Sequence, residues 1–248
     1  MPQIAKIALV TGANQGIGFE TVRQLAEKGV TVLLAGRSLA AAESAAAKLH
    51  TDGLVNVSPV KLDVTEAADR TATAQLIQRQ FGRLDILVNN AGMTAPQGTL
   101  MERLTINTTE EELQLVFETN LFAVLRLTSE VLPLLRESGG GRIVNVSSIL
   151  GSLNLHATQA EAVSYNKRFA YNASKAALNL FTIQLAQELD DTDIKVNSVH
   201  PGWVRTRSGT DLAPMEPSEG AKTSVAAALM GADGPTGTFF HFSETIPW

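Results

Sequence analysis

Strand-like and helix-like segments alternate along almost the whole chain. Short apolar runs at residues 4–10 and 30–35 have the length and composition of buried strands, and each precedes a segment with helical character. This alternation is typical of a parallel sheet, because the chain must cross back over the sheet between parallel strands. No Pro/Gly/Ser-rich linker or internal repeat interrupts the 248 residues. We therefore predict an α/β fold, a doubly wound parallel sheet in which residues 1–248 form a single domain.

The same patterns predict where the individual elements lie. Strands are expected at residues 4–10, 30–35, 55–62, 84–88, 142–146, 194–199 and 238–242. Helices are expected at residues 16–27, in an alanine-rich stretch through residue 48, at 66–81, at 109–137 and around Tyr171.

Composition restricts the possible partners and the compartment. A net charge of −5 argues against nucleic-acid binding, which depends on clustered Lys and Arg. The chain has no cysteine, which fits a reducing compartment, and it has neither a signal-peptide pattern nor an apolar run long enough to cross a membrane. We expect a cytoplasmic protein without nucleic-acid or membrane partners. No metal site is expected either, because the four histidines lack metal-ligand spacing.

A glycine-rich turn lies between the first expected strand and the first expected helix. Glycines there allow a tight turn and bring bare backbone close to a pyrophosphate, while the helix N-terminus offers unpaired N–H groups. Many strand-to-helix turns contain glycine for steric reasons alone. The position of this turn, after the first expected strand and before the first expected helix, favours dinucleotide binding. The residues expected to contact the cofactor are Gly12, Asn14, Gln15, Gly16, Ile17 and Gly18.

Two further loops follow expected strands, at the sheet edge where open α/β sheets bind ligands. The Asp63 carboxylate, followed by Val64, is placed either to accept a hydrogen bond from an adenine amino group or to serve the start of the next helix. In the segment from Asn89 to Gly92, Ala91 and Gly92 lack large side chains, so an adenosine and a ribose can lie close to their backbone. Asn89 and Asn90 are expected to tie neighbouring strands together, and Asn90 also to contact the cofactor.

Tyr171 and Lys175 are four residues apart in a helical segment, so both side chains can point into one cleft. A nearby cation favours the phenolate, and we expect it to lower the pKa of Tyr171 toward the working pH. Such a phenol can protonate a developing alkoxide. By chance, a Tyr and a Lys at this spacing are more often a solvated helix face, so the surrounding motifs decide between the two interpretations.

Six motifs in order resemble the short-chain dehydrogenase/reductase family. They are Thr11-Gly12-x-x-x-Gly16-x-Gly18, Asn89-Asn90-Ala91-Gly92, Asn120, Ser148, Tyr171-x-x-x-Lys175 and Pro201-Gly202. The resemblance implies a Rossmann-like sheet of about seven parallel strands and NAD(P)-dependent oxidoreduction of a carbonyl or alcohol. It also implies a catalytic tetrad of Asn120, Ser148, Tyr171 and Lys175, with Ser148 preferred to Ser147 because the family's serine usually stands second in such a pair.

The resemblance assigns roles around the nicotinamide. Lys175 would hold the nicotinamide ribose, Ser148 would donate to the substrate oxygen, and Asn120 would fix a water that links Lys175 to solvent. Asn120 could equally stabilise a helix kink. Further cofactor contacts are implied at Pro201, Gly202, Val204 and Thr206. Two cations near this segment, Arg205 and Arg207, are either solvated or placed to contact an anionic substrate.

The end of the second expected strand predicts which dinucleotide is used. An NAD-preferring site places a carboxylate there, but this chain has Gly36-Arg37-Ser38 and no acid before Glu43. Arg37 can bind a 2′-phosphate with its planar guanidinium, so NADP (NADPH) is expected and NAD is less favoured. Two readings oppose this: Arg37 could be merely solvated, and Gln15 stands where many NADP-using relatives carry a basic residue.

The predicted activity is NADPH-dependent reduction of a small-molecule ketone or aldehyde to an alcohol, with Tyr171 as general acid. The alternatives are a 3-oxoacyl-thioester reductase with the same tetrad and an NADP-binding regulator without turnover. A homodimer or homotetramer is expected through the helices at residues 109–137 and 171–189. An insert of roughly ten residues before Tyr171 resembles the carbonyl-reductase-like members of the family, and it is expected to shape the substrate mouth or alter subunit packing, or else to be a tolerated surface loop. The aromatic segment 239–248 is expected to pack either on the chain's own core or on a partner subunit.

Overall fold

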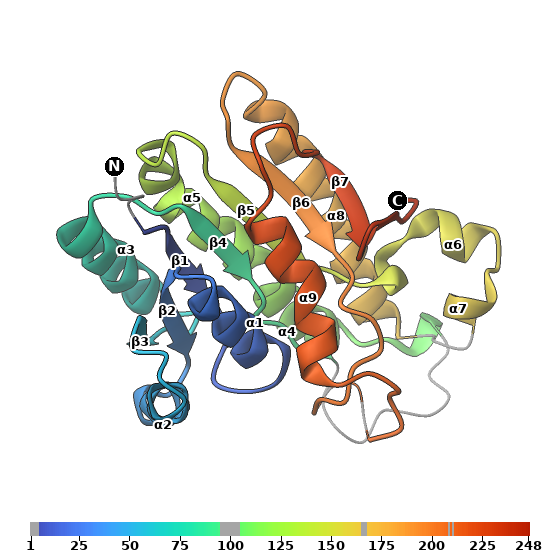
Figure 1. Ribbon diagram of the computed structural model, residues 1–248. Coiled ribbons are helices and arrows are strands. Elements are labelled where there is room, and N and C mark those ends of the chain that lie inside the picture. The colour runs from blue at the N-terminus through green and yellow to red at the C-terminus, as the bar shows by residue number, and fades with distance from the viewer. Residues whose placement is uncertain (1–4, 95–104, 165–167, 208, 210) are drawn as a thin grey trace.

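Seven parallel strands and one short antiparallel strand form a single sheet (Figure 1). The computed structural model describes residues 5–94, 105–164, 168–207, 209 and 211–248. The strands are β1 (Ile7–Val10), β2 (Thr31–Gly36), β3 (Val57–Lys61), β4 (Ile86–Asn89), β5 (Arg142–Val146), β6 (Lys195–Val199), β7 (Thr238–His241) and β8 (Glu244–Thr245). Their order across the sheet is β3-β2-β1-β4-β5-β6-β7-β8.

The strand prediction is confirmed with one addition. Seven parallel strands were expected, and the eighth strand, β8, pairs antiparallel with the end of β7. The chain reverses at Phe242, which has a φ of 50°, and a two-residue strand is too short to show a period in the sequence. The first strand begins at Ile7, and the expected start at Ile4 lies outside the described residues.

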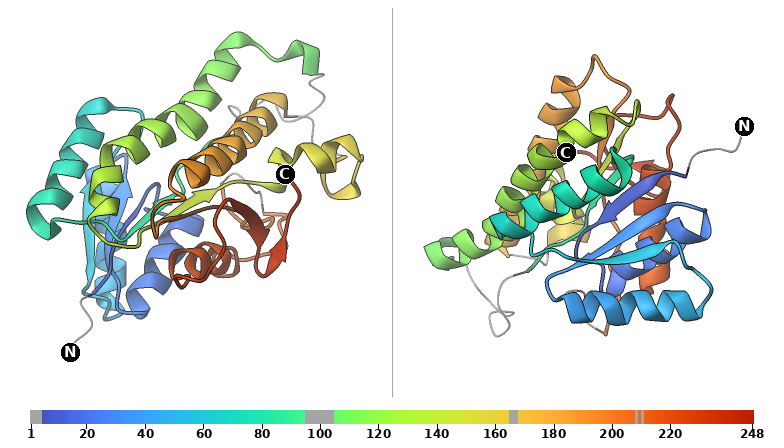
Figure 2. Two further views of the ribbon diagram at one scale, coloured as in Figure 1. Left: turned by 90° about the horizontal axis from the view of Figure 1, so that it is seen from above. Right: turned by 90° about the vertical axis from the view of Figure 1, so that its left-hand side faces the viewer.

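Helices cover both faces of the sheet (Figure 2). One face carries α1 (Gly16–Glu27), α2 (Leu39–Thr51) and α9 (Pro217–Ala228), and the other carries α3 (Ala67–Phe81), α4 (Glu110–Phe117), α5 (Ala123–Arg136) and α8 (Phe169–Glu188). Helix α9 was not among the expected elements, although Pro217 at its first turn and its four alanines are helix signals.

Alternate residues of the central strand supply the two hydrophobic cores. Ala8 and Val10 belong to the core beneath α1, α2 and α9, whereas Ile7 and Leu9 belong to the core beneath α3, α5 and α8. Successive side chains of a strand point to opposite faces, so a strand covered on both sides must be apolar throughout. This burial explains why β1 appears in the sequence as a continuous apolar run.

The helix expected over residues 109–137 is interrupted in its middle. Thr109 caps α4, since its Oγ1 accepts a hydrogen bond from the Glu112 backbone N–H at 3.2 Å. Residues Glu118–Phe122 then form a turn of π-helix, with Asn120 inside it, before α5 begins at Ala123. The expected helical stretch is therefore confirmed, and its irregularity lies at Asn120, the residue that the sequence marks as a poor helix former and a possible kink.

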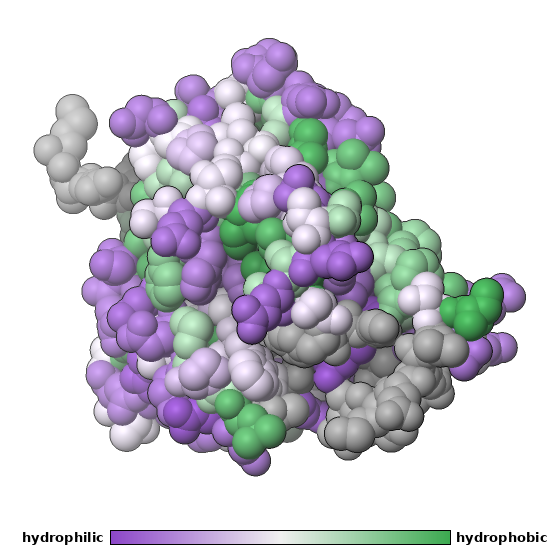
Figure 3. All heavy atoms as spheres, turned by 90° about the vertical axis from the view of Figure 1, so that its right-hand side faces the viewer, coloured by the Kyte–Doolittle hydropathy of each residue, from purple (hydrophilic) through white to green (hydrophobic). Residues whose placement is uncertain are grey.

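The insert before Tyr171 packs against the last residues of the chain. It contains two short helices, α6 (Leu153–Ala157) and α7 (Glu161–Ser164). Trp248 stacks on Phe239 of β7 with ring centroids 5.6 Å apart, and its carbonyl accepts from the Asn154 N–H at 2.8 Å. The aromatic segment thus packs on its own chain. Seen from the side that carries α6 and α7, hydrophobic residues form separate groups among hydrophilic ones (Figure 3).

Candidate active site

The candidate site lies where the strand order reverses, between the carboxyl ends of β1 and β4. Thr11 Oγ1 accepts hydrogen bonds from the backbone N–H of Asn90 at 3.0 Å and of Ala91 at 2.9 Å. In return, Asn90 Nδ2 donates to the carbonyls of Thr11 at 2.8 Å and Gly12 at 3.1 Å. These bonds join the two loops into one edge, which is the strand-tying role expected of Asn90.

Asn89 has the same tying role between β4 and β5. Its Nδ2 donates to Asn145 Oδ1 at 2.9 Å and to Thr128 Oγ1 at 3.3 Å, and both partners are buried. Asn89 is buried as well, so it supports the sheet edge from beneath rather than facing a ligand.

The glycines of the first turn are required by close backbone contacts. Gly12 has a φ of 62°, and a Cβ placed on it would lie 2.9 Å from Cα of Ala91. A Cβ on Gly18 would collide with Asn90 Nδ2 and lie 2.8 Å from the Gly12 carbonyl oxygen. Any side chain would push the two loops apart and fill the space beside the start of α1. The bare backbone of this cradle suits a pyrophosphate.

A cleft of about 830 Å³ runs along this edge of the sheet. The predicted cofactor residues that line it are Gly12, Asn14, Gln15, Gly16, Ile17, Gly18, Arg37, Asp63, Val64, Asn90, Ala91, Gly92, Tyr171, Lys175, Pro201 and Thr206. Residues not predicted also line it, namely Leu62, Thr65, Met93, Thr94, Leu115, Thr119, Val146, Ser147 and Pro217. Several of these adjoin predicted residues in the sequence, whereas Leu115 and Thr119 reach the cleft through the packing of the interrupted helix.

Two predicted residues of the active centre lie on one face of α8. Tyr171 and Lys175 both line the cleft, and Lys175 Nζ is 5.8 Å from the Tyr171 ring centroid. Lys175 is buried, with its ammonium donating to the Val146 carbonyl at 2.8 Å. A Cβ on Gly92 would lie 3.6 Å from that ammonium, so the second loop passes directly over it. The i,i+4 spacing therefore places a phenol and a cation in the same cleft as the glycine turn.

This geometry agrees with comparisons to known proteins. Residues 6–217 match the family described as short chain dehydrogenase. The chain belongs to the short-chain dehydrogenase family. A short-chain dehydrogenase from Penicillium roqueforti is 36% identical over 236 residues, covering 91% of this chain and 89% of the relative.

Solved structures agree over nearly the full chain. Salutaridine reductase from Papaver somniferum superposes with a TM-score of 0.82 at 31% identity, covering 95% of this chain and 99% of that one. An NADPH-bound carbonyl reductase from chicken fatty liver superposes with a TM-score of 0.84 at 26% identity, covering 99% and 100%. The predicted family and its carbonyl-reductase-like relatives are confirmed. The chain is accordingly an NAD(P)-dependent oxidoreductase that acts on a carbonyl or CH–OH group.

The acid–base properties of the dehydrogenase's phenol differ from the prediction. Burial raises the pKa of Tyr171 above 10.0, and this effect exceeds the lowering caused by the hydrogen bond with Ser148 and by the charge of Arg168. The expected lowering of this pKa was therefore wrong in this structure. Burial also lowers the pKa of Lys175 from 10.5 to about 8. The phenol is consequently neutral near pH 7 and holds the proton that a reduction needs.

The two adjacent serines after β5 are placed differently. The interaction of Ser148 with the phenol lowers the pKa of Tyr171, although by less than burial raises it, and Ser148 Oγ accepts from the Leu150 N–H at 3.2 Å. Ser147 lines the cleft, is buried and has no hydrogen-bond partner for its Oγ among the described residues. The contact with the phenol favours Ser148 as the predicted catalytic serine.

Asn120 bridges the π-turn to the loop after β4. Its Oδ1 accepts from the Met93 N–H at 2.9 Å, while its Nδ2 donates to the Met93 carbonyl at 2.9 Å and to Ser174 Oγ at 3.0 Å. Asn120 is fully buried, so these bonds support its role in stabilising the interrupted helix. Its role in fixing a water remains a prediction.

Gly202 and Val204 do not line the cleft, and their cofactor contacts remain predictions. Gly202 has a φ of 90°, and a Cβ on it would collide with Met215. Val204 is buried, and its side chain fills the space that a Cβ on Gly220 of α9 would need. Both residues shape the loop that presents Pro201 and Thr206 to the cleft.

Three arginines line the cleft in different environments. Arg205 pairs with Glu216 at 3.0 Å and donates to the Ala213 carbonyl at 3.0 Å. Arg37 and Arg207 are exposed and have no ion-pair or hydrogen-bond partner within the part of the chain that the structure describes. The cleft thus holds two cations whose charge is available to an anionic ligand.

Metal-ligating side chains do not cluster in the described part of the chain. It contains no group of three or more His, Asp or Glu side chains arranged to hold a metal ion. None of the helices described is long and apolar enough to cross a membrane.

Proposed function

We propose that this dehydrogenase uses NADPH to reduce a ketone or aldehyde to the alcohol, with Tyr171 as the general acid. The observation that carries the proposal is that the glycine turn, Arg37, Tyr171 and Lys175 all line one and the same cleft. When bound, the nicotinamide of NADPH supplies the hydride. The protein's task is to hold the carbonyl, stabilise the negative charge that grows on its oxygen and deliver a proton there.

The side chains of the centre divide this task. The Ser148 hydroxyl donates a hydrogen bond to the carbonyl oxygen, and the phenol of Tyr171 transfers its proton to the same oxygen. The raised pKa of Tyr171 keeps that proton available at neutral pH. The Lys175 ammonium lies beneath the Gly92 loop, placed to bind ribose hydroxyls and to favour the phenolate left after proton transfer.

Arg37 supports the choice of NADPH over NADH. It stands at the end of β2, lines the cleft and has no described partner. It also precedes Ser38, the N-cap of α2, whose first-turn N–H groups add to the attraction for a phosphate. A charge-assisted hydrogen bond is worth roughly 1.5–3 kcal/mol, or about ten- to a hundredfold in affinity.

The test compares the two cofactors in wild type and Arg37→Ala. We expect kcat/KM with NADPH to exceed that with NADH by at least about tenfold, and the preference to collapse in Arg37→Ala. Arg79→Ala is the matched control, because Arg79 is exposed near the end of α3 and does not line the cleft. Equal efficiency with both cofactors in the wild type, or full discrimination by Arg37→Ala, would refute Arg37 as the determinant.

The physiological substrate is sought by screening ketones and aldehydes while cofactor absorbance is followed. Turnover of any carbonyl with NADPH also excludes the alternative of a regulator without activity. Loss of signal with every carbonyl, despite tight NADPH binding, would favour that alternative.

A second candidate, 3-oxoacyl-thioester reduction, is favoured by Arg207. This arginine is exposed on the cleft without a described partner, where the anionic groups of a carrier-bound thioester could pair with it. If this candidate is correct, Arg207→Ala lowers kcat/KM for a 3-oxoacyl-CoA about tenfold and leaves that for a simple ketone unchanged. Turnover of ketones alone would decide against it.

A further inference from the structure

Arg70 is a buried cation in an unfavourable place. It lies in the first turn of α3, where the positive end of the helix dipole disfavours a cation, and its side chain is only 6% exposed. Removing a guanidinium from water costs several kcal/mol unless it is paired and hydrogen-bonded. Its contacts therefore indicate what this arginine does.

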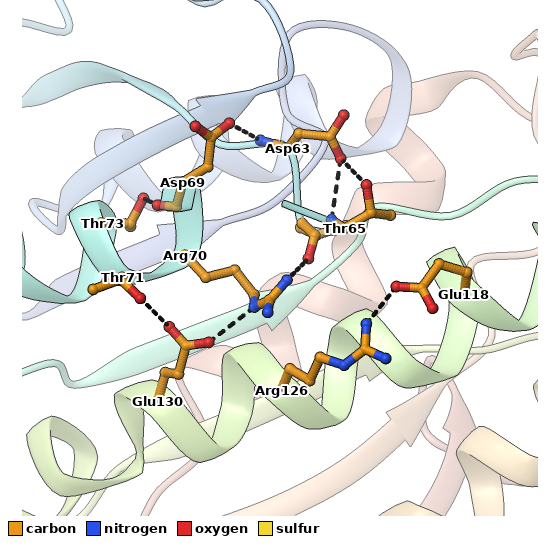
Figure 4. A network of polar contacts seen from close by, with 10 residues as sticks. Asp63, Thr65, Asp69, Arg70, Thr71, Thr73, Glu118, Arg126 and Glu130 are labelled. Atoms are coloured by element: carbon orange, nitrogen blue, oxygen red, sulfur yellow. Dashed lines mark hydrogen bonds and ion pairs between the residues drawn. The ribbon is translucent and has the colours of Figure 1, made fainter. Parts of the chain in front are cut away.

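Two contacts hold the guanidinium, one on each side. Nε donates to Glu130 Oε1 on α5 at 2.9 Å, and Glu130 Oε2 also accepts from Thr71 Oγ1 at 3.4 Å. Nη1 donates to the backbone carbonyl of Val64 at 2.9 Å. Figure 4 shows Arg70 between Glu130 and the turn that leads into Thr65. Arg70 thus connects α5 to a turn of the cleft wall.

Asp69, the neighbour of Arg70, contacts the turn at residues 63–65 at its first residue, Asp63. One carboxylate oxygen of Asp69 accepts from the Asp63 N–H at 2.9 Å, and the other accepts from Lys61 Nζ at 2.9 Å. Within the turn, Asp63 Oδ1 accepts from the N–H of Thr65 at 3.1 Å and from its Oγ1 at 2.8 Å (Figure 4). The backbone of residues 63–65 is therefore fixed from outside by two consecutive residues of α3.

The fixed turn belongs to one end of the cleft. Residues 62–65 all line it, and they follow β3, the neighbour of β2. Arg37 follows β2, the strand next to β3, so it lies at the same end of the cleft as this turn. Tyr171 and Lys175 lie at the other end, where Lys175 donates to the Val146 carbonyl at the end of β5. The turn is thus next to the proposed 2′-phosphate contact and remote from the proton donor.

We propose that Arg70, anchored by Glu130, is a positioning residue that sets the turn at residues 63–65 for the adenosine end of the dinucleotide. This inference rests on the proposed function, since it needs a dinucleotide in the cleft. The adenine is common to NADH and NADPH, so disturbing the turn weakens both cofactors equally. Arg37, in contrast, changes the ratio between them.

The experiment measures NADPH and NADH dissociation constants, and kcat at saturating NADPH, for Arg70→Met and Arg70→Lys. Met keeps much of the volume but removes both hydrogen bonds, and we expect both dissociation constants to rise about tenfold. Their ratio and kcat are expected to stay within about twofold of the wild type. Arg70→Lys keeps a cation for Glu130 and is expected to recover part of the loss.

A matched control separates positioning from general destabilisation. Ile77→Ala creates a cavity on the core side of the same helix, and Ile77 does not line the cleft. It is expected to lower Tm while leaving the NADPH dissociation constant unchanged. If Arg70→Met does not fold, Glu130→Gln is measured instead, with an expected rise of about threefold in both constants.

The outcomes distinguish this inference from the proposed function. A wild-type protein that binds neither dinucleotide would refute the proposed function and the inference together. A wild type that binds NADPH, with Arg70→Met or Glu130→Gln variants that bind it equally well, would overturn the inference alone. The inference would also fail if Ile77→Ala raised the dissociation constant as much as Arg70→Met.

Discussion

At the level of single residues, the site combines a proton donor, Tyr171, with a cation, Lys175, and burial shifts the pKa values of the two groups in opposite directions. Burial favours the neutral form of each group, so it raises the pKa of Tyr171 and lowers that of Lys175 to about 8. The free energy that burial costs the ammonium is offset in part by its hydrogen bond to the Val146 carbonyl. The position of Lys175 in the cleft therefore lowers the stability of the folded protein while it places a cation beside Tyr171.

Removing the proton donor should separate chemistry from binding. Tyr171→Phe retains the ring in the cleft but has no proton to give, so we expect kcat/KM for carbonyl reduction to fall about 10²–10⁴-fold. The NADPH dissociation constant is expected to change less than about twofold, and fluorescence titration of NADPH checks this. A variant with near wild-type kcat would contradict the proposed role of Tyr171.

Replacing the buried lysine should change how stability depends on pH. Below about pH 8 the lysine is protonated in both states, so the wild type bears the full cost of burying the ammonium. Between about 8 and 10.5 the unfolded chain holds a proton that the folded protein has lost, so wild-type stability rises with pH. Lys175→Met lacks this dependence.

The expected result is a change in the difference between the two proteins. The unfolding free energy of Lys175→Met minus that of the wild type should fall by up to about 3 kcal/mol as pH rises through this window. Urea unfolding at several pH values measures it, and other titrating groups cancel in the difference. Parallel curves for the two proteins would show that the ammonium is not destabilised by burial.

At the scale of elements, the interrupted helix joins the cofactor loops to α8. The π-turn directs Asn120 toward Met93 of the loop after β4 and toward Ser174 of α8. Ser174 Oγ in turn donates to the Tyr171 carbonyl at 2.7 Å. A regular helix would rotate Asn120 away from these partners, which gives the π-turn a structural reason next to the active centre.

Loss of this bridge should destabilise the protein. Asn120→Ala leaves the N–H and carbonyl of Met93 without their side-chain partner, and we expect the free energy of unfolding to fall by about 2–4 kcal/mol. Urea denaturation measures the change. Gln114→Ala is the control, since Gln114 is exposed on α4 with a surface hydrogen bond to Glu110 and should change stability by about 0.5 kcal/mol or less.

At the scale of the whole molecule, exposed apolar side chains on neighbouring helices support the proposed assembly. Phe122 and Leu125 are exposed on the interrupted helix, and Leu180 is 54% exposed on α8. Helix α8 packs against α4 and against the π-turn that follows α4, so Phe122 and Leu180 lie on adjoining helical segments. Exposed apolar groups on adjoining helices are typical of a subunit interface.

The expected particle is a homodimer or homotetramer, with at least twice the 26.4 kDa of one chain. Leu180→Glu places a charge in the proposed interface and should shift the mass measured by light scattering toward the monomer. Val55→Glu is the control, because Val55 is 81% exposed between α2 and β3. A 26.4 kDa wild-type particle at micromolar concentration would refute the assembly.

Local sequence patterns were enough to predict the sheet, the ligand-binding edge and most of the residues that line the cleft. Strands buried on both faces must be apolar, and turns with close backbone contacts need glycine, so β1 and the turn from Gly12 to Gly18 are visible in local patterns. The pair Tyr171 and Lys175 was likewise predictable, because helical periodicity fixes which residues share a face.

Features that depend on residues distant in the sequence became visible only in the folded chain. The direction of the Tyr171 pKa follows from how deeply packing buries the phenol, and the π-turn at Asn120 follows from hydrogen bonds to Met93 and Ser174. Arg70 appears in the sequence as one more helical cation, and only the fold brings it between Glu130 and Val64. Local patterns record what the backbone needs, whereas burial and long-range hydrogen bonds exist only once the elements pack together.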